Sequence, residues 1–305
     1  MVHCAVIVVT LTIFSSALYV FCFFESSINY TFSPTFQFKN NETERILIEN
    51  EKQNSLLSVQ FLRDYYSKYA HARVMHLNSI TAQSGFATLY NVLVPEVYCP
   101  NLIRVGNVND GGKWVCNPAE MPRNCSIFSL GLREDISFDR DLQEFNENSC
   151  ELYGFDMIAQ SDSTRLDYSK INGKLYKKTI AERTDTQANM FTIEDCMREN
   201  GVESMEMLKM DIEGAEYQVI VPFLQKHKPC QVFIELHGLA YDMLSLLHAI
   251  ARQDYFLFFY EINGDSLKAC EYSFIHSSCL KAYGLFPLSP YLKNLDKKKY
   301  LPAGI

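Results

Sequence analysis

The sequence predicts an α/β domain built on a mostly parallel central sheet, with helices on both faces and an antiparallel hairpin at one edge. Two observations predict this fold class. Short apolar runs typical of buried strands alternate with helical segments between residues 125 and 253. Two further strand-like runs, residues 255–263 and 271–277, are separated by a turn at the sequence NGD and are close enough to pair as a hairpin.

The expected elements follow one another in chain order. Five strands are expected before the hairpin, at residues 125–132, 150–157, 173–181, 205–212 and 230–238. Helices are expected at residues 50–76, 136–149, 192–200, 215–227 and 242–253. Thr192 has the position of an N-cap, and one helix ends before Pro229. The polar segment from Ser161 to Gly173 is expected to be a loop.

Composition and charge narrow the classes of function. The chain has 305 residues, of which 48% are hydrophobic, and this is ample for one sizeable packed domain. Its formal net charge is -8, and its basic runs are as short as KKK at residues 297–299. A nucleic-acid groove would show as a clustered basic face, so the charge pattern argues against a nucleic-acid partner.

The segment from Cys4 to Phe24 carries no charged residue and has the roughly 20 residues that a bilayer crossing requires. We expect an uncleaved signal anchor at residues 1–24, and a signal peptide cleaved after Ala17 is the alternative. Residues 25–85 are expected to form a polar stem and a leading helix, and residues 86–305 the main domain. The chain would then be a single-pass membrane protein facing the secretory lumen, with the Golgi as one candidate organelle, or a secreted protein.

Sequons and cysteines agree with a lumenal body. Sequons of the type NxS/T begin at Asn29, Asn41 and Asn124. Eight of the ten cysteines lie beyond the apolar segment, where an oxidising lumen permits disulfides, and none has the spacing of zinc ligands. Four of them cluster in one region: Cys99, Cys116, Cys125 and Cys150. A bridge between the first two would contribute about 3 kcal/mol in the chain-entropy model, but the sequence leaves the pairing open.

Carboxylates and a histidine lie where three of the predicted strands end. These residues are Asp156, Asp211, Glu213, Glu235 and His237. In doubly wound sheets, ligands bind outside the carboxyl ends of the strands, so these side chains are expected to meet in one crevice. The alternative is a local role for each of them. Asp211 would then cap the following helix, and Glu216 would favour the helix N-terminus through its charge.

The strand-end motifs resemble a known family. LKMDIEGAE at residues 208–216, TIED at 192–195 and IELHG at 234–238 resemble the FkbM-type branch of S-adenosylmethionine-dependent methyltransferases. RVGNVNDGGKWVCNP at 104–118, followed by IFSLGLREDISFD and LYGFD, resembles an animal subgroup of methyltransferase-like proteins, many with an apolar anchor. The resemblance covers roughly residues 90–285 and implies a Rossmann-like methyltransferase fold with S-adenosylmethionine as cofactor. The family's first-strand loop is usually glycine-rich, whereas this chain has only Gly131 there.

The residues suit a nucleoside cofactor that carries an amino acid on a cationic sulfonium. Asp156 is placed to accept hydrogen bonds from both ribose hydroxyls, and Gly131, which has no Cβ, lets the backbone approach the cofactor. The turn at Asp110, Gly111 and Gly112 has two interpretations. It is either a hairpin loop or a second backbone approach near the amino-acid end of the cofactor, with Asp110 near the amine.

Methyl transfer is an in-line displacement, and aligning donor and acceptor is worth about 7–11 kcal/mol in favourable cases. A hydroxyl acceptor must also lose a proton. His237 is either the general base, because its unperturbed pKa is near 6.5, or a structural histidine at a strand end. Asp211 or Glu235 would orient it or hold the acceptor. Asp211, Glu213 and Glu235 offer hard oxygen ligands for magnesium or manganese, but family members differ in this respect, and no metal is assigned.

The sequence therefore predicts a methyltransferase that acts on a hydroxyl of a glycan or a small molecule. This acceptor class follows from the compartment and the resemblance and not from any residue. Two alternatives stay open. One is a lumenal glycosyltransferase, in which DIE stands for an Asp-x-Asp metal motif. The other is a catalytically degenerate methyltransferase-fold binding protein, which the single-glycine loop favours. The oligomeric state is not defined by the sequence.

Overall fold

The computed structural model describes residues 13–14, 17–18 and 41–296, with side chains from residue 57 onward. The chain divides into two units, Met1–Glu51 and Lys52–Ile305. In the first unit, β1 (Ile13–Phe14) pairs antiparallel with β2 (Ala17–Leu18). The rest of the predicted anchor lies outside the described residues. Among the described residues, no helix has both the length and the apolar character that a bilayer crossing requires.

The leading helix is longer than the sequence pattern predicts. Helix α1 spans Asn41–Asn78, so it begins inside the segment that was expected to be stem. Glu, Arg, Leu and Lys are good helix formers, and their frequency in that segment outweighs its polarity. Near the other end of the helix, Leu77 and the following Ile80 are completely buried in the main core. The end of α1 therefore packs as part of the second unit.

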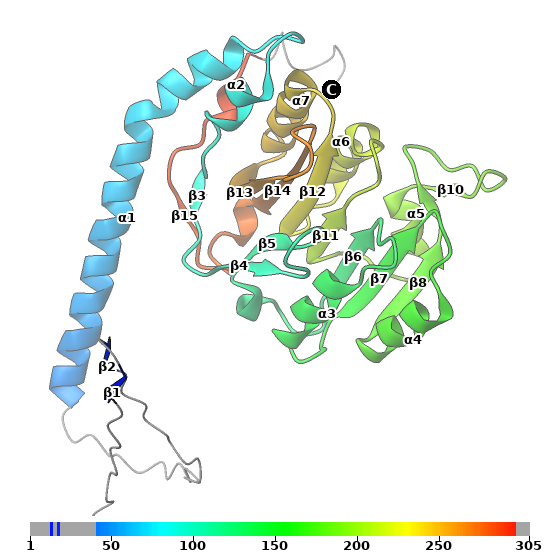
Figure 1. The fold of residues 1–305 in the computed structure, drawn as a ribbon, viewed down its shortest axis with the longest axis horizontal. Helices are drawn as coiled ribbons and strands as arrows, with labels where there is room; N and C mark the ends of the chain where they lie inside the picture. The colour runs from blue at the N-terminus through cyan, green and yellow to red at the C-terminus, as the bar shows by residue number, and fades with distance from the viewer. Residues whose placement is uncertain (1–12, 15–16, 19–40, 297–305) are drawn as a thin grey trace, which may run out of the picture. The chain divides into compact units, whose positions relative to one another are not determined.

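A seven-stranded sheet forms the centre of the second unit (Figure 1). Its strand order is β13-β14-β12-β11-β6-β7-β8, and every strand is parallel to the others except β14, which runs antiparallel to both neighbours. The predicted fold class and edge hairpin are therefore confirmed. In chain order the strands are β6 (Ser126–Leu130), β7 (Glu151–Asp156), β8 (Gly173–Lys177), β11 (Met207–Met210), β12 (Gln231–His237), β13 (Tyr255–Ile262) and β14 (Ala269–His276).

The two faces of this sheet are covered by different elements (Figure 1). One face packs against α2 (Phe86–Tyr90), α5 (Ile193–Glu199), α6 (Glu216–Lys226) and α7 (Ala240–Ala251). The other face packs against α3 (Ser137–Glu144), α4 (Asp162–Lys170) and the hairpin of β4 (Leu102–Val105) and β5 (Lys113–Cys116). The predicted Thr192 cap is confirmed, because its side chain accepts the N–H of Asp195 in a capping box.

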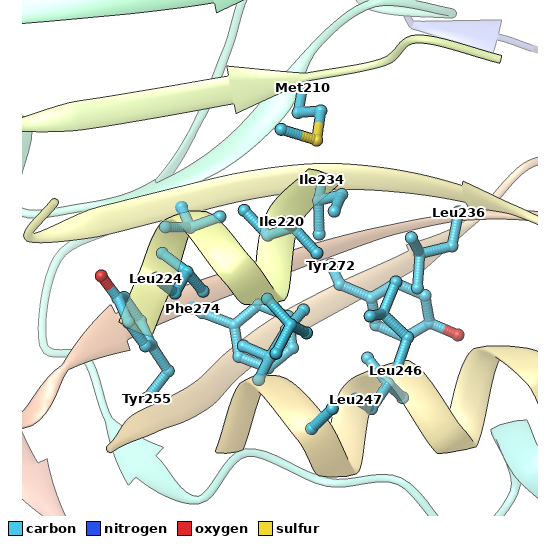
Figure 2. Close-up of a cluster of buried hydrophobic side chains, with 14 of the residues drawn as sticks. Met210, Ile220, Leu224, Ile234, Leu236, Leu246, Leu247, Tyr255, Tyr272 and Phe274 are labelled. Atoms are coloured by element: carbon cyan, nitrogen blue, oxygen red, sulfur yellow. The ribbon is translucent and has the colours of Figure 1, made fainter. Parts of the chain in front are cut away.

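Apolar side chains fill the layer between the sheet and helices α6 and α7 (Figure 2). Met210, Ile234 and Phe274 project from three neighbouring strands and are completely buried. Ile220 and Leu247 meet them from the two helices. Burying a side chain of this size contributes about 1.5–3 kcal/mol, so this layer supplies much of the free energy that holds the sheet in place.

Two expectations about local structure are wrong. The polar segment from Ser161 to Gly173 contains helix α4, because the Ser161 hydroxyl accepts the N–H of Thr164 as an N-cap and Tyr168 buries its ring completely. The strand predicted at residues 173–181 ends at Lys177. The chain then continues as β9 (Thr179–Ile180), which pairs parallel with β10 (Met190–Phe191) outside the main sheet.

The remaining described elements are short. They are β3 (Val97–Tyr98), β15 (Phe286–Pro287) and the 3-10 helices η1 (Pro118–Glu120), η2 (Ser277–Cys279) and η3 (Leu292–Asn294). Strands β3 and β15 pair antiparallel. Just before β3, the buried carboxylate of Glu96 accepts the backbone N–H groups of Leu257, Tyr291 and Leu292 at 2.7–3.1 Å. One side chain thereby joins three segments that are far apart in the sequence.

The described residues contain three disulfides: Cys99–Cys116, Cys125–Cys150 and Cys230–Cys279. Cys196 and Cys270 are buried free thiols. Cys125, Cys150 and Cys230 directly precede β6, β7 and β12, and the N–H of Cys116 donates to Gln231 at the start of β12. All three disulfides therefore lie at the amino-end edge of the parallel strands.

Glu96 is expected to make stability depend on pH. Burial raises its pKa to about 7 from an ordinary value of 4.5, against the opposing effect of its three backbone N–H donors. The neutral acid thus stabilises the fold fully below about pH 4.5, and this contribution is lost as the pH rises through 7. In urea unfolding between pH 5 and 8, the stability advantage of the wild type over Glu96→Gln should shrink with rising pH. A constant difference would show that Glu96 does not titrate in this range.

Candidate active site

A cavity of about 690 Å³ opens at the carboxyl-end edge of β6, β7 and β11. The expected crevice therefore exists, and five of the predicted site residues line it: Asp110, Gly111, Gly131, Asp156 and Asp211. The predicted Gly112, Glu235 and His237 are not part of its lining.

The carboxylate of Asp156 is buried at the end of β7 and already has three hydrogen-bond donors. Its Oδ2 accepts the N–H groups of Leu132 at 2.9 Å and Arg133 at 2.8 Å, and its Oδ1 accepts the N–H of Ile158 at 2.7 Å. A carboxylate has about four lone-pair sites. In the geometry observed, about one lone-pair site of Asp156 therefore remains for a ribose hydroxyl.

The loop after β6 takes left-handed backbone conformations with a single glycine. Gly131 has φ +77°, and Arg133 and Glu134 follow with φ +48° and +67°. A Cβ at Gly131 would overlap the carbonyl oxygen of Asp211, so the glycine is needed where two strand-end loops touch each other. Left-handed non-glycine residues cost energy, and Asp156 offsets this cost by accepting the Arg133 N–H. The loop therefore keeps its shape without the glycine-rich sequence usual in the family.

The turn at Asp110 is a hairpin loop that also reaches the cavity. It belongs to the connection between β4 and β5, and Asp110 and Gly111 line the cavity. Gly112 instead lies against the guanidinium of Arg104, which donates to the carbonyl of Asn109 at 2.6 Å. Arg104 thus holds the loop in place, and Gly112 makes room for Arg104.

Among the carboxylates that follow β11, Glu216 has a structural role in the loop. Its side chain is completely buried and accepts the N–H groups of Ile212 at 2.6 Å and Gly214 at 2.7 Å. It closes the loop between β11 and α6, in which Glu213 has φ +55° and lines the cavity. Asp211 remains available, because its Oδ1 is buried and has no hydrogen-bond partner among the described residues.

His237 lies beside Asp211, although it does not line the cavity. One ligand atom each of Asp211, Glu216 and His237 lies within 4.8 Å of the other two. The Nε2 of His237 is 3.6 Å from Oε1 of Glu235, and the side chain of Glu235 is 6% exposed. Burial, followed by the charges of Glu271 and Asp211, raises the pKa of Glu235 to about 8. Glu235 is therefore largely protonated at neutral pH.

Sequence reasoning missed a buried ion pair next to Glu235. Glu271 on β14 lies directly opposite Glu235 and forms an ion pair with Lys113 of β5. Lys209 on β11 is also buried and donates to the carbonyl of Gly131 at 2.8 Å, and it lines the cavity. The signal was present in the sequence, since each of these is a lone charged residue within a strand run.

The cavity also has an apolar wall that the sequence analysis did not identify. Met157 and Ile158 directly follow Asp156, and their residues are 62% and 64% exposed. Ile180 and Ile212 also line the cavity, from β9 and from the loop after β11. Exposed apolar residues beside a polar strand end are typical of ligand sites.

A family model described as Methyltransferase domain matches residues 57–276. The chain belongs to this methyltransferase family. Its seven-stranded sheet with helices on both faces is the Rossmann-like fold that the sequence predicted. A comparison with curated proteins found no match.

Solved structures similar to this chain include an FkbM methyltransferase from Methylobacillus flagellatus KT. It is 17% identical, with 49% of this chain and 43% of that chain covered and a TM-score of 0.38. This chain thus spans less than half of that protein. Fibrillarin from Aeropyrum pernix, with natively bound S-adenosyl-L-methionine, is 10% identical over 59% of this chain and 84% of its own, with a TM-score of 0.34.

Gly131→Ala should destabilise the protein more than the cost of a left-handed backbone alone would predict. Gly201 is the matched control, because it has φ +66° and no heavy atom within 4 Å of an added Cβ. Gly201→Ala should cost about 1–2 kcal/mol, the usual penalty of the left-handed conformation. Gly131→Ala should cost clearly more in urea unfolding, because its Cβ meets the Asp211 carbonyl. Equal losses would mean that the two loops are not in contact.

Proposed function

We propose that this protein is an S-adenosylmethionine-dependent methyltransferase of the FkbM type. The observation that carries the proposal is the cavity at the carboxyl-end edge of a methyltransferase-domain fold, with Asp156, Gly131 and Asp211 in its lining. A nucleoside cofactor that carries an amino acid would contact both the polar and the apolar parts of the cavity wall.

The lining fits the cofactor in three parts. The remaining lone pair of Asp156 would accept one ribose hydroxyl. Met157 and Ile158 would pack against the purine ring. Asp110 is placed for the ammonium group of the amino-acid end, as the sequence analysis proposed. When bound, the cofactor supplies an electrophilic methyl group on a cationic sulfonium.

The acceptor would be handled by His237, Asp211 and Glu235, the residues to which the sequence analysis assigned catalysis. Asp211 links the cavity to His237. In the metal-free chain, the imidazole of His237 would take the proton that a hydroxyl acceptor loses when its oxygen bonds to the methyl carbon. Glu235 would hold the imidazole in place, since their side chains are 3.6 Å apart.

We propose a glycan or small-molecule hydroxyl as the acceptor and the secretory pathway as the compartment. Three disulfides are consistent with an oxidising compartment, and the sequon residue Asn124 is exposed. No nucleic-acid partner is proposed. N-terminal sequencing of material from secreting cells tests the anchor. An intact N-terminus in the membrane fraction is expected, and a secreted chain that begins at Leu18 would replace the anchor with a cleaved signal peptide.

Asp156→Ala should abolish the heat of S-adenosylmethionine binding in calorimetry of the full-length chain. Glu151→Ala is the matched control, because Glu151 is an exposed carboxylate at the opposite end of the same strand. Asp156→Asn keeps one acceptor oxygen for the loop amides and should bind more weakly than the wild type. If a folded Asp156→Ala chain binds as the wild type does, the site assignment is wrong.

The same titration separates the alternative functions. Heat with a nucleotide sugar and manganese, above that of manganese alone, and none with S-adenosylmethionine would favour the glycosyltransferase. The absence of heat with either compound would favour the catalytically degenerate binding protein.

A further inference from the structure

Three metal-ligating side chains converge beside the cofactor cavity from two strand ends. Asp211 and Glu216 come from the two ends of the loop after β11, and His237 is the last residue of β12. Each offers one ligand atom within 4.8 Å of the other two, a spacing that a single ion can bridge. We propose that these three residues bind a divalent cation.

Two of the three side chains present buried polar atoms without partners. Oδ1 of Asp211 and Nδ1 of His237 are inaccessible to solvent and have no hydrogen-bond partner among the described residues. Native structures rarely leave such atoms unsatisfied, because each one costs about 1–3 kcal/mol. A cation bound by both atoms would remove this cost.

The surroundings of the ligands resemble the outer shell of a metal site. Metal-bound histidines usually direct their second ring nitrogen to a carboxylate, and metal-bound carboxylates are usually hydrogen-bonded themselves. Nε2 of His237 faces Oε1 of Glu235 at 3.6 Å, which leaves Nδ1 for an ion. The carboxylate of Glu216 is fixed by the N–H groups of Ile212 and Gly214.

The carboxylates of the proposed site also lack an ion-pair partner. Glu216 is completely buried, yet in the described part of the chain no lysine or arginine forms an ion pair with Asp211 or Glu216. The nearby Lys113 pairs with Glu271 instead. Buried charges are normally paired or bound to a metal, and the buried Lys113 and Lys209 act on Asp211 through their charge without forming an ion pair with it.

The ligand set favours a cation such as Mn²⁺. Two carboxylates suit hard ions, and one imidazole extends the choice to Mn²⁺ and Zn²⁺. Three protein ligands leave coordination positions open for water or an acceptor oxygen. That use of the ion rests on the proposed methyltransferase function, because Asp211 also lines the cofactor cavity. With the ion bound, His237 would be a ligand and no longer the general base.

Binding of Mn²⁺ to the EDTA-treated full-length chain can be measured by the loss of the free-ion electron paramagnetic resonance signal. One saturable site is expected. Asp211→Asn and His237→Gln should each weaken it at least about tenfold. Glu213→Gln is the matched control, because Glu213 is an acid of the same loop that lies outside the group of three. It should change the affinity less than about twofold.

Two results would overturn the inference: the absence of saturable Mn²⁺ binding, or a loss in Glu213→Gln as large as that in Asp211→Asn. Thermal unfolding shows whether each variant is folded. If Asp211→Asn is not folded, the comparison with Glu213→Gln uses His237→Gln instead. Titration of the same sample with S-adenosylmethionine in EDTA tests the proposed function separately. Cofactor binding without Mn²⁺ binding would remove only the metal site.

Discussion

Buried carboxylates that accept backbone N–H groups are the interaction on which the rest of the structure depends. Where parallel strands end, the loops leave amide groups without sheet partners, and these groups lie in a region of low dielectric. Asp156 satisfies three of them and Glu216 two. Glu96 does the same for three N–H groups from two other segments, Leu257 in β13 and the adjacent Tyr291 and Leu292. Each carboxylate converts a flexible connection into a fixed wall of the cavity or of the core.

Side chains alternate between the two faces of the sheet along each strand, and this alternation explains where the buried charged residues lie. Leu208, Ile234 and Tyr272 point into the apolar layer against α6 and α7. The alternate positions Lys209, Glu235 and Glu271 point to the opposite face, which carries the β4–β5 hairpin. One face can therefore supply packing energy while the other face gathers charges at the edge where the cavity opens.

Much of this could be predicted from the sequence. The strands and their parallel or antiparallel orientations follow from apolar runs and connection lengths. Asp156 and Asp211 lie in the cavity because parallel strands end at a common edge. The sequence could not show that Asp156 is already occupied by amides, or that Gly131 meets Asp211 rather than a ligand. Those facts depend on the separation of two loops, which no local pattern encodes. The disulfide pairing depends likewise on contacts between distant segments.

The position of the three disulfides has a consequence for how this molecule can change over evolutionary time. They cross-link the margin of the sheet where the parallel strands begin, and none of the described disulfides lies at the margin where those strands end. Disulfides thus secure one side, and the other is held by noncovalent contacts such as the hydrogen bonds of Asp156 and Glu216. Substitutions around the opening can then accumulate and alter what is recognised there, while the scaffold beneath retains its architecture.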